Sequence, residues 1–471
     1  MKPTIATLLT TALLAGHSIA GTAAKPEPKK ADTPLLSFLD GKLVFDVQER
    51  LRYEKRENNF DFNQNAKAAT DDDWLLQRFR IGMMIKPASW LKLYVQAQDS
   101  REFFSRRALI PGTGGAEGDD AFDLRQAYVD ISDYSKCPWG LKVGRQILSY
   151  GDERLVGAFE WNNFGRTFDA VKLTYKTKGF TADAFVSTPV IITRNKFNES
   201  DLFDTAYANR DLVFSGIYAT FDELPFGTLD LYTLLVDQPR GNTSNNQGTL
   251  AAATTTGSLA RHSDFVTLGT RVKGDPKKLN GFEFQGEFAY QVGDVRGLSL
   301  SAFAANVGAG YNFDTPLKPR IYAEYNYASG DSNSADGSIG TFQNLFPTNH
   351  KFYGMMDAFA WQNLHNVMLS FKITPVKDVT AQVDYNAFWL ADNGDTWYRA
   401  NGLTAVRTLN AAARNASSFC GHEVDFVVNW NVNKHLQVQG GYSHFFAGSY
   451  LRGTGASSDA DFGYLQATIT F

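Results

Sequence analysis

The sequence predicts an all-β protein, a single transmembrane antiparallel β-barrel of about 18 strands with short periplasmic turns and long extracellular loops. Three observations predict this fold. Side chains alternate between apolar and polar along most of the chain, the connections alternate between short and long, and the last segment alternates up to a terminal aromatic residue, Phe471. A membrane barrel produces this pattern because each strand has one lipid face and one lumen face.

The alternation is clearest in the segment 281–292. Its even positions are mainly aromatic or aliphatic, and its odd positions are mainly Glu or Gln. Segments of this kind recur along the chain and define eighteen predicted strands. These strands span residues 42–54, 73–86, 90–101, 122–133, 139–149, 168–177, 179–189, 211–221, 227–238, 262–274, 280–293, 298–313, 319–330, 363–375, 378–391, 420–432, 434–447 and 460–471.

The connections between these segments sort by length. After the even-numbered segments they are short, as at 86–89 and 374–378, and after the odd-numbered ones they are mostly long, as at 238–261 and 330–362. A soluble β-sandwich also alternates, but its loops need not sort in this way. The pattern therefore favours a barrel with both termini on the short-turn side. One link, 293–297, is short although it should lie on the long-loop side.

The N-terminus has the features of an export signal. A lysine is followed by a mainly apolar run at 5–15 and then by small residues suited to cleavage. That run is too short for a membrane-spanning helix, which needs about 20 apolar residues. We therefore expect a signal peptide at 1–24, a periplasmic leader at 25–40 and the barrel at 41–471, located in the bacterial outer membrane.

Composition and motifs argue against several classes of function. The net charge of −4 does not suit a general nucleic-acid binder, which needs a basic surface. The seven histidines show no metal-ligand spacing, and no nucleophile elbow, phosphate-binding loop or HExxH motif occurs. Ser443 and His444 point to opposite strand faces, so they are a weak pair for a barrel-wall hydrolase. Acidic stretches at 71–73 and 331–336 could bind calcium, although such clusters are more often simply solvated. We expect no enzyme activity and no cofactor, and we assign no role to the two cysteines.

If the apolar faces point to lipid, the opposite faces line a lumen wide enough for water. Basic residues dominate the lumen face of the first six strands, whereas acidic ones concentrate in the second half of the chain. Two interpretations remain open. The basic side attracts an anionic or sugar-like solute, or the charges only solvate the interior and neutralise one another. The basic lumen residues are Arg50, Arg52, Arg78, Arg80, Lys92 and Lys172, joined later by Arg271 and Arg320, and the acidic ones are Glu283, Glu287, Asp384, Glu423 and Asp425.

The segment 141–175 is the most unusual part of the chain, because two alternating stretches flank a loop dense in charge, glycine and aromatic residues. In a soluble enzyme such a loop would be a lid. In a barrel it would fold into the lumen, and the rest of the chain favours the barrel. Arg145 has the strand parity of lipid-facing Leu141 and Val143. We expect a bulge at Gly144 that turns Arg145 inward, and the alternative is snorkelling near the strand end.

The same segment resembles the pattern typical of the alginate-export porin family. The residues that carry the resemblance are Gly144-Arg145-Gln146, the YGDERL stretch from Tyr150 to Leu155, Trp161, Asn163 and the GRTFDA stretch from Gly165 to Ala170. Leu124–Ile131 (LRQAYVDI) and Glu49–Glu54 (ERLRYE) also look like pieces of that family. The similarity in motif covers residues 40–190, and the later strands agree in pattern.

The resemblance implies an outer-membrane porin for passive passage of anionic or carbohydrate solutes, an exopolysaccharide such as alginate among them. It also implies that Arg145, Arg154 and Arg166 are lumen or constriction arginines, with Asp152 and Asp169 as their carboxylate partners. The partners expected are outer-membrane lipid, the solute, and envelope secretion or assembly components, with no nucleic acid. The alternative is a barrel with a mainly structural or surface-binding role, in which the long loops 238–261, 330–362 and 391–419 engage an external partner.

Overall fold

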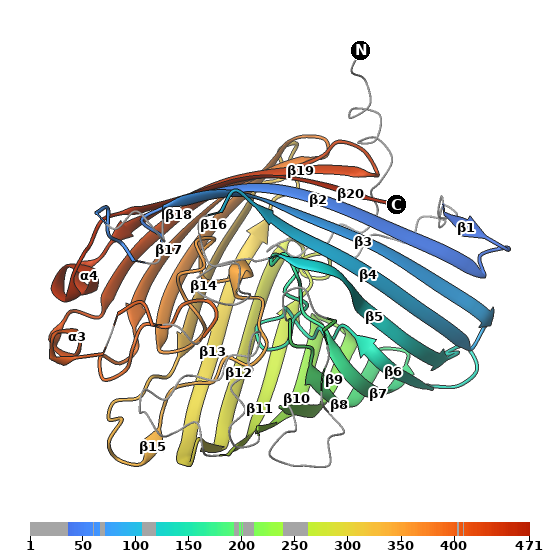
Figure 1. The fold of residues 1–471 in the computed structure, drawn as a ribbon, viewed down its shortest axis with the longest axis horizontal. Coiled ribbons are helices and arrows are strands. Elements are labelled where there is room, and N and C mark those ends of the chain that lie inside the picture. The colour runs from blue at the N-terminus through green and yellow to red at the C-terminus, as the bar shows by residue number, and fades with distance from the viewer. Residues whose placement is uncertain are drawn as a thin grey trace.

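The structure is a computed structural model. It describes residues 36–59, 61–65, 71–105, 119–192, 197–198, 200, 212–238, 262–402, 405–407 and 409–471. Eighteen long strands form one antiparallel sheet that closes on itself, and this confirms the predicted fold class (Figure 1). Among the described residues, no helix is both long and apolar enough to cross a membrane.

Each predicted strand corresponds to one long strand of the barrel, with ends that agree within a few residues. The long strands are β2 (Leu43–Glu57), β3 (Asp72–Ala88), β4 (Leu91–Phe103), β5 (Asp120–Ser132), β6 (Trp139–Gln146), β7 (Phe168–Thr177), β8 (Phe180–Pro189), β9 (Val213–Leu224), β10 (Gly227–Gln238), β11 (Ser263–Gly274), β12 (Phe282–Val295), β13 (Leu298–Asn312), β14 (Arg320–Ala328), β16 (Leu364–Val376), β17 (Val379–Leu390), β18 (Phe419–Asn431), β19 (Leu436–Ala447) and β20 (Ala460–Thr470). The smaller elements are β1 (Ser37–Phe38), β15 (Ser338–Ile339), η2 (Asn349–Lys351), α3 (Ala411–Asn415) and α4 (Ser449–Thr454).

The barrel closes between its first and last long strands. β2 pairs with β20 in a register that runs from Gln48↔Thr470 to Glu57↔Asp461. Pairing the two ends of the sheet satisfies the backbone groups that an open edge would expose to lipid. Along β2, buried Arg52 lies between exposed Leu51 and Tyr53, so the strand has an apolar outer face and a polar inner face.

The connections sort by length as predicted. At one end of the barrel the links between strands are short, as between β7 and β8, and at the other end they are long, as between β14 and β16. In Figure 1, α3, α4 and β15 lie at the long-loop end, and β1 lies at the opposite end. The short link between β12 and β13 is also present. Arg296 and Gly297 have φ values of 52° and 77° there, as a type I′ hairpin turn requires.

Two long connections fold into the barrel (Figure 1). We call residues 147–167, between β6 and β7, the first inner loop, and residues 329–363, between β14 and β16, the second inner loop. They pair with each other through a parallel bridge between Val156 and Phe346. Many of the largest buried side chains belong to these loops or contact them. They include Phe342, Phe346, Tyr353, Trp361 and Trp397, so packed side chains fill the long-loop half of the lumen.

The strand pairing corrects the prediction of a bulge at Gly144. β6 pairs with both neighbours through Gly144 without a shift, in the register Ala127↔Arg145↔Asp169. Gly144 has a φ of 118°, and a Cβ atom there would lie 2.3 Å from the carbonyl oxygen of Ala127. The position therefore needs glycine because of backbone conformation and close approach.

The bulge lies in β5 instead. Gln96 of β4 pairs with Gln126, and the next residue, Ala97, pairs with Leu124, so Arg125 is an extra residue on β5. An extra residue of this kind re-aims the side chain that it carries. As a result Arg125 points toward the lumen, although strict alternation along β5 would turn it outward.

Several predictions fall on residues that the structure does not describe. These are the signal peptide, the leader up to residue 35 and the loop at 239–261. Both cysteines are free, with Cys137 exposed and Cys420 buried.

Candidate functional site in the barrel lumen

Arginines on the inner face of β2, β3 and β5 hold the first inner loop. Their side chains are all buried, and they lie on neighbouring parts of one wall because alternate residues of β2 and β3 face inward and the bulge in β5 adds one more. We call this group the arginine wall. It consists of Arg50, Arg52, Arg78, Arg80 and Arg125.

One carboxylate of the loop, Glu160, pairs with three of these arginines. Its Oε2 lies 2.7 Å from Nη1 of Arg80 and 3.1 Å from Nη2 of Arg78, and its Oε1 accepts a 2.5 Å bond from Nη2 of Arg125. Burial alone would raise the pKa of Glu160, but the guanidinium groups of Arg80, Arg125 and Arg78 together hold that pKa well below its usual range. Glu160 is therefore ionised at neutral pH and anchors the loop to the wall.

Other bonds of the wall go to neutral oxygens of the loop. Arg50 donates to the carbonyl oxygens of Glu160 and Trp161 at 2.8 and 3.2 Å. Arg52 donates to the carbonyl oxygen of Trp161 at 2.7 Å, and its guanidinium carbon lies 3.8 Å from the centre of the indole ring. The same ring stacks on His350 of the second inner loop, with ring centroids 3.8 Å apart. Trp161 thus joins the arginine wall to the second inner loop.

Gly165 allows the loop to pass close to the wall. Its φ is 72°, in the left-handed region that favours glycine. A Cβ atom there would lie 3.0 Å from Nη2 of Arg125 and 3.1 Å from Nη2 of Arg80. A larger residue would therefore push against two members of the arginine wall.

The beginning of the first inner loop reaches a different part of the barrel. Arg154 donates to Glu324 of β14 at 2.6 Å, and both side chains are buried. Asp152 accepts bonds from Arg271 of β11, at 2.7 Å, and from Lys273 of the same strand. Burial alone would raise the pKa of Asp152, but Arg271 and Lys273 hold it well below its usual range. The resemblance implied Asp152 as the partner of a loop arginine, whereas its partners are these two residues of β11.

Arg166 ties the two inner loops together. It donates to the carbonyl oxygens of Gly157, Phe346 and Pro347 at 3.0, 2.5 and 2.9 Å. Two of these acceptors belong to the second inner loop. The role that the geometry gives Arg166 is therefore to fix one loop against the other.

Arg145 and Asp169 pair with each other, as the resemblance implied, but away from the arginine wall. Their two bonds measure 2.8 and 3.0 Å. The register of β6 and β7 places them on the same face as exposed Val143 and Val171, at the long-loop rim. Arg145 also donates to the carbonyl oxygen of Asn198 at 2.7 Å. By strand parity this pair faces outward.

The remaining predicted basic residues lie on the inner face nearer the short turns, and each has an acidic partner. Lys92 lies 3.5 Å from Asp130, Lys172 lies 2.8 Å from Asp183, and Arg320 lies 2.5 Å from Glu283. These pairs agree with the interpretation that such lumen charges neutralise one another.

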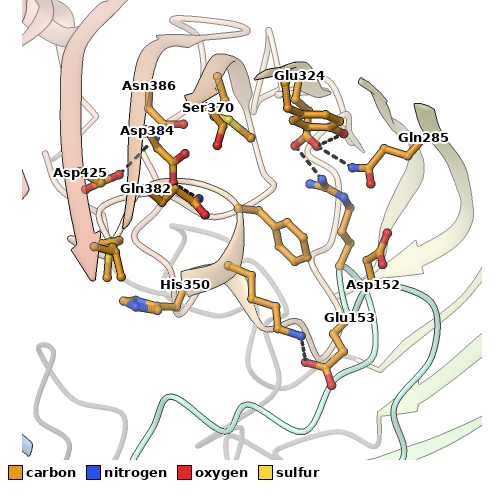
Figure 2. A pocket seen from close by; sticks show the side chains of 18 of the residues that line it. Asp152, Glu153, Gln285, Glu324, His350, Ser370, Gln382, Asp384, Asn386 and Asp425 are labelled. Atoms are coloured by element: carbon orange, nitrogen blue, oxygen red, sulfur yellow. Dashed lines mark hydrogen bonds and ion pairs between the residues drawn. The ribbon is translucent and has the colours of Figure 1, made fainter. Parts of the chain in front are cut away.

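A cavity of about 320 Å³ lies where the two inner loops meet the inner faces of β12, β14 and β16 to β19. In Figure 2, Asp384 and Asp425 lie on one side of it, and Glu324 and Asp152 lie on the other. Glu153 of the first inner loop accepts a 2.8 Å bond from Lys351 of the second. The predicted acidic residues of β17 and β18 do gather, because Asp384 pairs directly with Asp425 in the register of the two strands.

Sequence reasoning missed several residues of this site. Alternation alone could have found Lys273, which has the same parity as Arg271. Arg125 was hidden because the bulge in β5 reverses its parity. His350 and Lys351 lie in a long loop whose inward path leaves no periodic signal. In the part of the chain that the structure describes, no group of three or more His, Cys, Asp or Glu side chains is arranged to hold a metal ion.

Comparison with known families decides the identity of the chain. A model of the family described as alginate export matches residues 42–464. The chain belongs to the alginate export family. A search of curated proteins finds no match.

Solved structures with the same fold are outer-membrane proteins of Pseudomonas aeruginosa. OccK1 (OpdK) is 11% identical with a TM-score of 0.58 and covers 91% of this chain and 98% of its own. OccK11 (OpdR) is 12% identical with a TM-score of 0.55, covering 91% and 96%. OccD3 (OpdP) is 11% identical with a TM-score of 0.57, covering 92% of each chain. At this identity the likeness shows the fold, which is that of a porin. An alginate export protein with a porin fold is a transport channel rather than an enzyme.

Proposed function

We propose that this barrel lies in the bacterial outer membrane and passes anionic or carbohydrate solutes passively, an exopolysaccharide such as alginate among them. The arginine wall and the first inner loop form the selective part of the channel in this proposal. The observation that carries it is the concentration of five buried guanidinium groups on three strands of one wall. The membership in the alginate export family supports the class of solute.

The bonding of the wall suits a solute rich in oxygen. Arg50 and Arg52 donate to carbonyl oxygens of the loop, and these are neutral acceptors. A carboxylate accepts the same bonds more strongly than a neutral carbonyl oxygen does, because the bonds then join two opposite charges. Arginine stays charged at any working pH. A passing uronate could therefore replace the loop oxygens at the wall without leaving the guanidinium groups unsatisfied.

The first inner loop sets how much of the wall a solute can reach. It crosses from the arginine wall to Arg154 and Asp152, whose partners lie on β14 and β11. Glu160 is the loop carboxylate that already occupies three guanidinium groups. An anionic solute therefore competes with Glu160, and passage along the wall requires this part of the loop to shift.

One of the similar structures supports an organic anion as the kind of solute. It is the structure of OpdK with vanillate, which is 12% identical to this chain. The binding of an organic anion by a barrel of this fold agrees with a lumen whose arginines face the passing molecule.

The experiment is a current-block assay on single channels in a planar bilayer. A short oligouronate is compared with a neutral oligosaccharide of the same length. We expect the oligouronate to interrupt the current at lower concentration, and we expect higher salt to weaken the block because salt screens the charges. Equal block by the two sugars would contradict an anion-selective wall.

A second function rests on the packing in the lumen. Phe342, Phe346 and Trp361 are buried in the long-loop half, as expected for a barrel plugged by its own loops. Such a barrel would have a mainly structural or surface-binding role through its remaining long loops. The same bilayer experiment separates the two functions, because a plugged barrel shows no steps of conductance.

A further inference from the structure

The start of the first inner loop packs on a part of the lumen that the arginine wall does not include. Three buried aromatic side chains lie there on the inner faces of β8, β9 and β10. We call Phe185, Tyr218 and Tyr232 the aromatic platform. Tyr150 of the loop stacks on this platform, with its ring centroid 4.6 Å from that of Tyr218 and 5.7 Å from that of Phe185. Tyr218 stacks in turn on Tyr232, at 5.3 Å with ring planes 4° apart.

Two residues after this ring, the carboxylate of Asp152 meets two cations of β11 beside the platform. Its Oδ2 lies 2.7 Å from Nη2 of Arg271, and its Oδ1 accepts a bond from Lys273. Gly151 joins the ring and the carboxylate with a φ of 57°, and a Cβ atom there would lie 2.9 Å from Oη of Tyr218. The glycine therefore allows the loop to press an aromatic ring and a carboxylate against the same wall.

A ring joined to a carboxylate by a short link is also what a uronate unit presents. The carbon–hydrogen faces of a sugar ring pack on aromatic side chains, and its carboxylate pairs with arginine or lysine. Acceptors for sugar hydroxyl groups lie beside the platform. Asp183 accepts a 3.0 Å bond from Oη of Tyr150, and Glu287 accepts a 2.8 Å bond from Oη of Tyr232. The wall thus offers each kind of contact that an acidic sugar needs.

The main parts of this wall hold one another without the loop. Arg271 pairs with Asp230 of β10 at 2.7 Å, so its guanidinium group keeps a partner and a fixed place. The stack between Tyr218 and Tyr232 lies wholly within the barrel strands. The platform and the guanidinium group are therefore already arranged for a ligand when the loop withdraws, which reduces the ordering that binding requires.

Lys273 gives the sign of the ligand's charge. Among the residues that the structure describes, Asp152 is the one ion-pair partner of Lys273. Both side chains line the cavity of about 320 Å³ between the inner loops, so a solute in this cavity reaches them directly. Leaving a partly buried cation without its partner is unfavourable. A solute that displaces Asp152 is therefore favoured if it brings a negative charge of its own.

We propose that this wall is a uronate subsite, and that the loop segment 150–152 occupies it as an internal mimic of the solute. The inference rests on the proposed function, because it places the same class of solute at a second wall of the channel. An arriving sugar ring takes the place of Tyr150 on Tyr218. Its carboxylate, or that of the adjoining unit, takes the place of Asp152 beside the two cations. Binding at this subsite thereby releases the start of the loop and favours the open channel.

Single substitutions in the stack test the competition between loop and solute. The assay is block of the single-channel current by a short oligouronate. Tyr150→Leu takes the stacking from the loop but not from the solute, so we expect block at about 2- to 10-fold lower concentration, the range expected for one aromatic contact. Tyr218→Leu takes the stacking from both competitors, so we expect block close to that of the wild type. Unchanged or weaker block in Tyr150→Leu would overturn the mimic.

The decisive variant combines the two substitutions. In the Tyr150→Leu background, Tyr218→Leu removes the stacking of the solute alone, and we expect the block to weaken again by about 2- to 10-fold. Tyr218→Phe in the same background is the matched control, because phenylalanine keeps the flat ring and should keep the tight block. Heat-modifiable migration on gels checks that each variant has folded. Equal block with Leu and Phe at position 218 would overturn the subsite, since loosened packing of the loop alone does not distinguish them.

A neutral oligosaccharide of the same length separates this inference from the proposed function. Equal block of the wild type by the two sugars overturns the proposed function and, with it, a uronate as the occupant of this wall. A preference for the oligouronate that is unaffected by the substitutions at position 218 overturns the subsite alone.

Discussion

The substitution Glu160→Gln tests the role of the first inner loop most sharply. The amide keeps the size and shape of the side chain but removes the charge that Arg78, Arg80 and Arg125 share. The bonds from Arg50 and Arg52 to backbone oxygens stay in place. The variant therefore loosens the loop from the arginine wall and leaves the wall itself unchanged.

The expected size of the effect follows from the burial of the group. Removing one partner of a fully buried ion pair costs about 3–5 kcal/mol, whereas exposed pairs contribute about 0–1 kcal/mol. The side chain of Glu160 is 31% exposed, and those of its three partners are 4–6% exposed. The lost ion pairing therefore costs about 2–3 kcal/mol, between these two limits, and it raises the population of displaced loop by about 30- to 150-fold.

The assay is single-channel recording of Glu160→Gln beside the wild type. We expect longer or more frequent high-conductance periods and a stronger preference for anions, because three guanidinium groups lose their carboxylate. The control is Glu153→Gln in the same loop, which pairs with Lys351 and not with the arginine wall. Unchanged gating in Glu160→Gln, or a loss of anion preference, would refute the reasoning.

The pH dependence of the wild type follows from the same group. The pKa of Glu160 in the folded barrel lies well below its usual range. The ion pairing between Glu160 and the arginine wall is therefore fully present above the ordinary pKa of glutamate. It is lost only as the pH falls through the lower pKa that Glu160 has in the folded barrel. Conductance should stay constant from pH 7 down to about 5 and rise only in stronger acid. Glu160→Gln should lack this acid-induced rise.

Three further substitutions separate the roles of other residues. Arg154→Ala leaves the buried carboxylate of Glu324 without its ion pair, so it should lower the free energy of unfolding by about 3 kcal/mol. Thermal unfolding measures this change, and an unchanged melting temperature would contradict the buried pair. Gly165→Ala places a Cβ atom against Arg80 and Arg125 at a φ of 72°. The substitution should lower stability by about 1–2 kcal/mol and displace the first inner loop. Faster proteolysis of this loop would show the displacement. Arg145→Ala removes a buried arginine that strand parity places on the outer face at the rim, so the reversal potential should match that of the wild type. A shift toward cations would place Arg145 in the ion path.

The sequence was sufficient to predict the barrel because every strand crosses the same two environments. Lipid on one face and a polar lumen on the other impose a period of two, and that period survives in most of the eighteen segments, although the bulge in β5 interrupts it. Even the short link at Arg296 and Gly297 was correctly located, although it broke the rule of long loops on that side.

The site was harder to predict, because its geometry depends on contacts between distant parts of the chain. Arg50, Arg52, Arg78 and Arg80 were found from parity. Arg125 was missed because a bulge has no reliable sequence signal, and the bulge expected at Gly144 lies in β5 instead. The second inner loop also escaped prediction. Its path is set by the burial of side chains such as Phe346 and Trp361, and a long loop rich in Gly, Asn and Ser shows no periodicity that would reveal that path.

The reversal potential of the wild-type barrel under a salt gradient tests the central claim most directly. Its value gives the ratio of anion to cation permeability for the unmodified lumen. We predict a preference for anions, and a smaller preference in Arg78→Gln, which removes one charge from the arginine wall. Equal permeability, or a preference for cations, in the wild type would contradict an anion-selective channel lined by this wall.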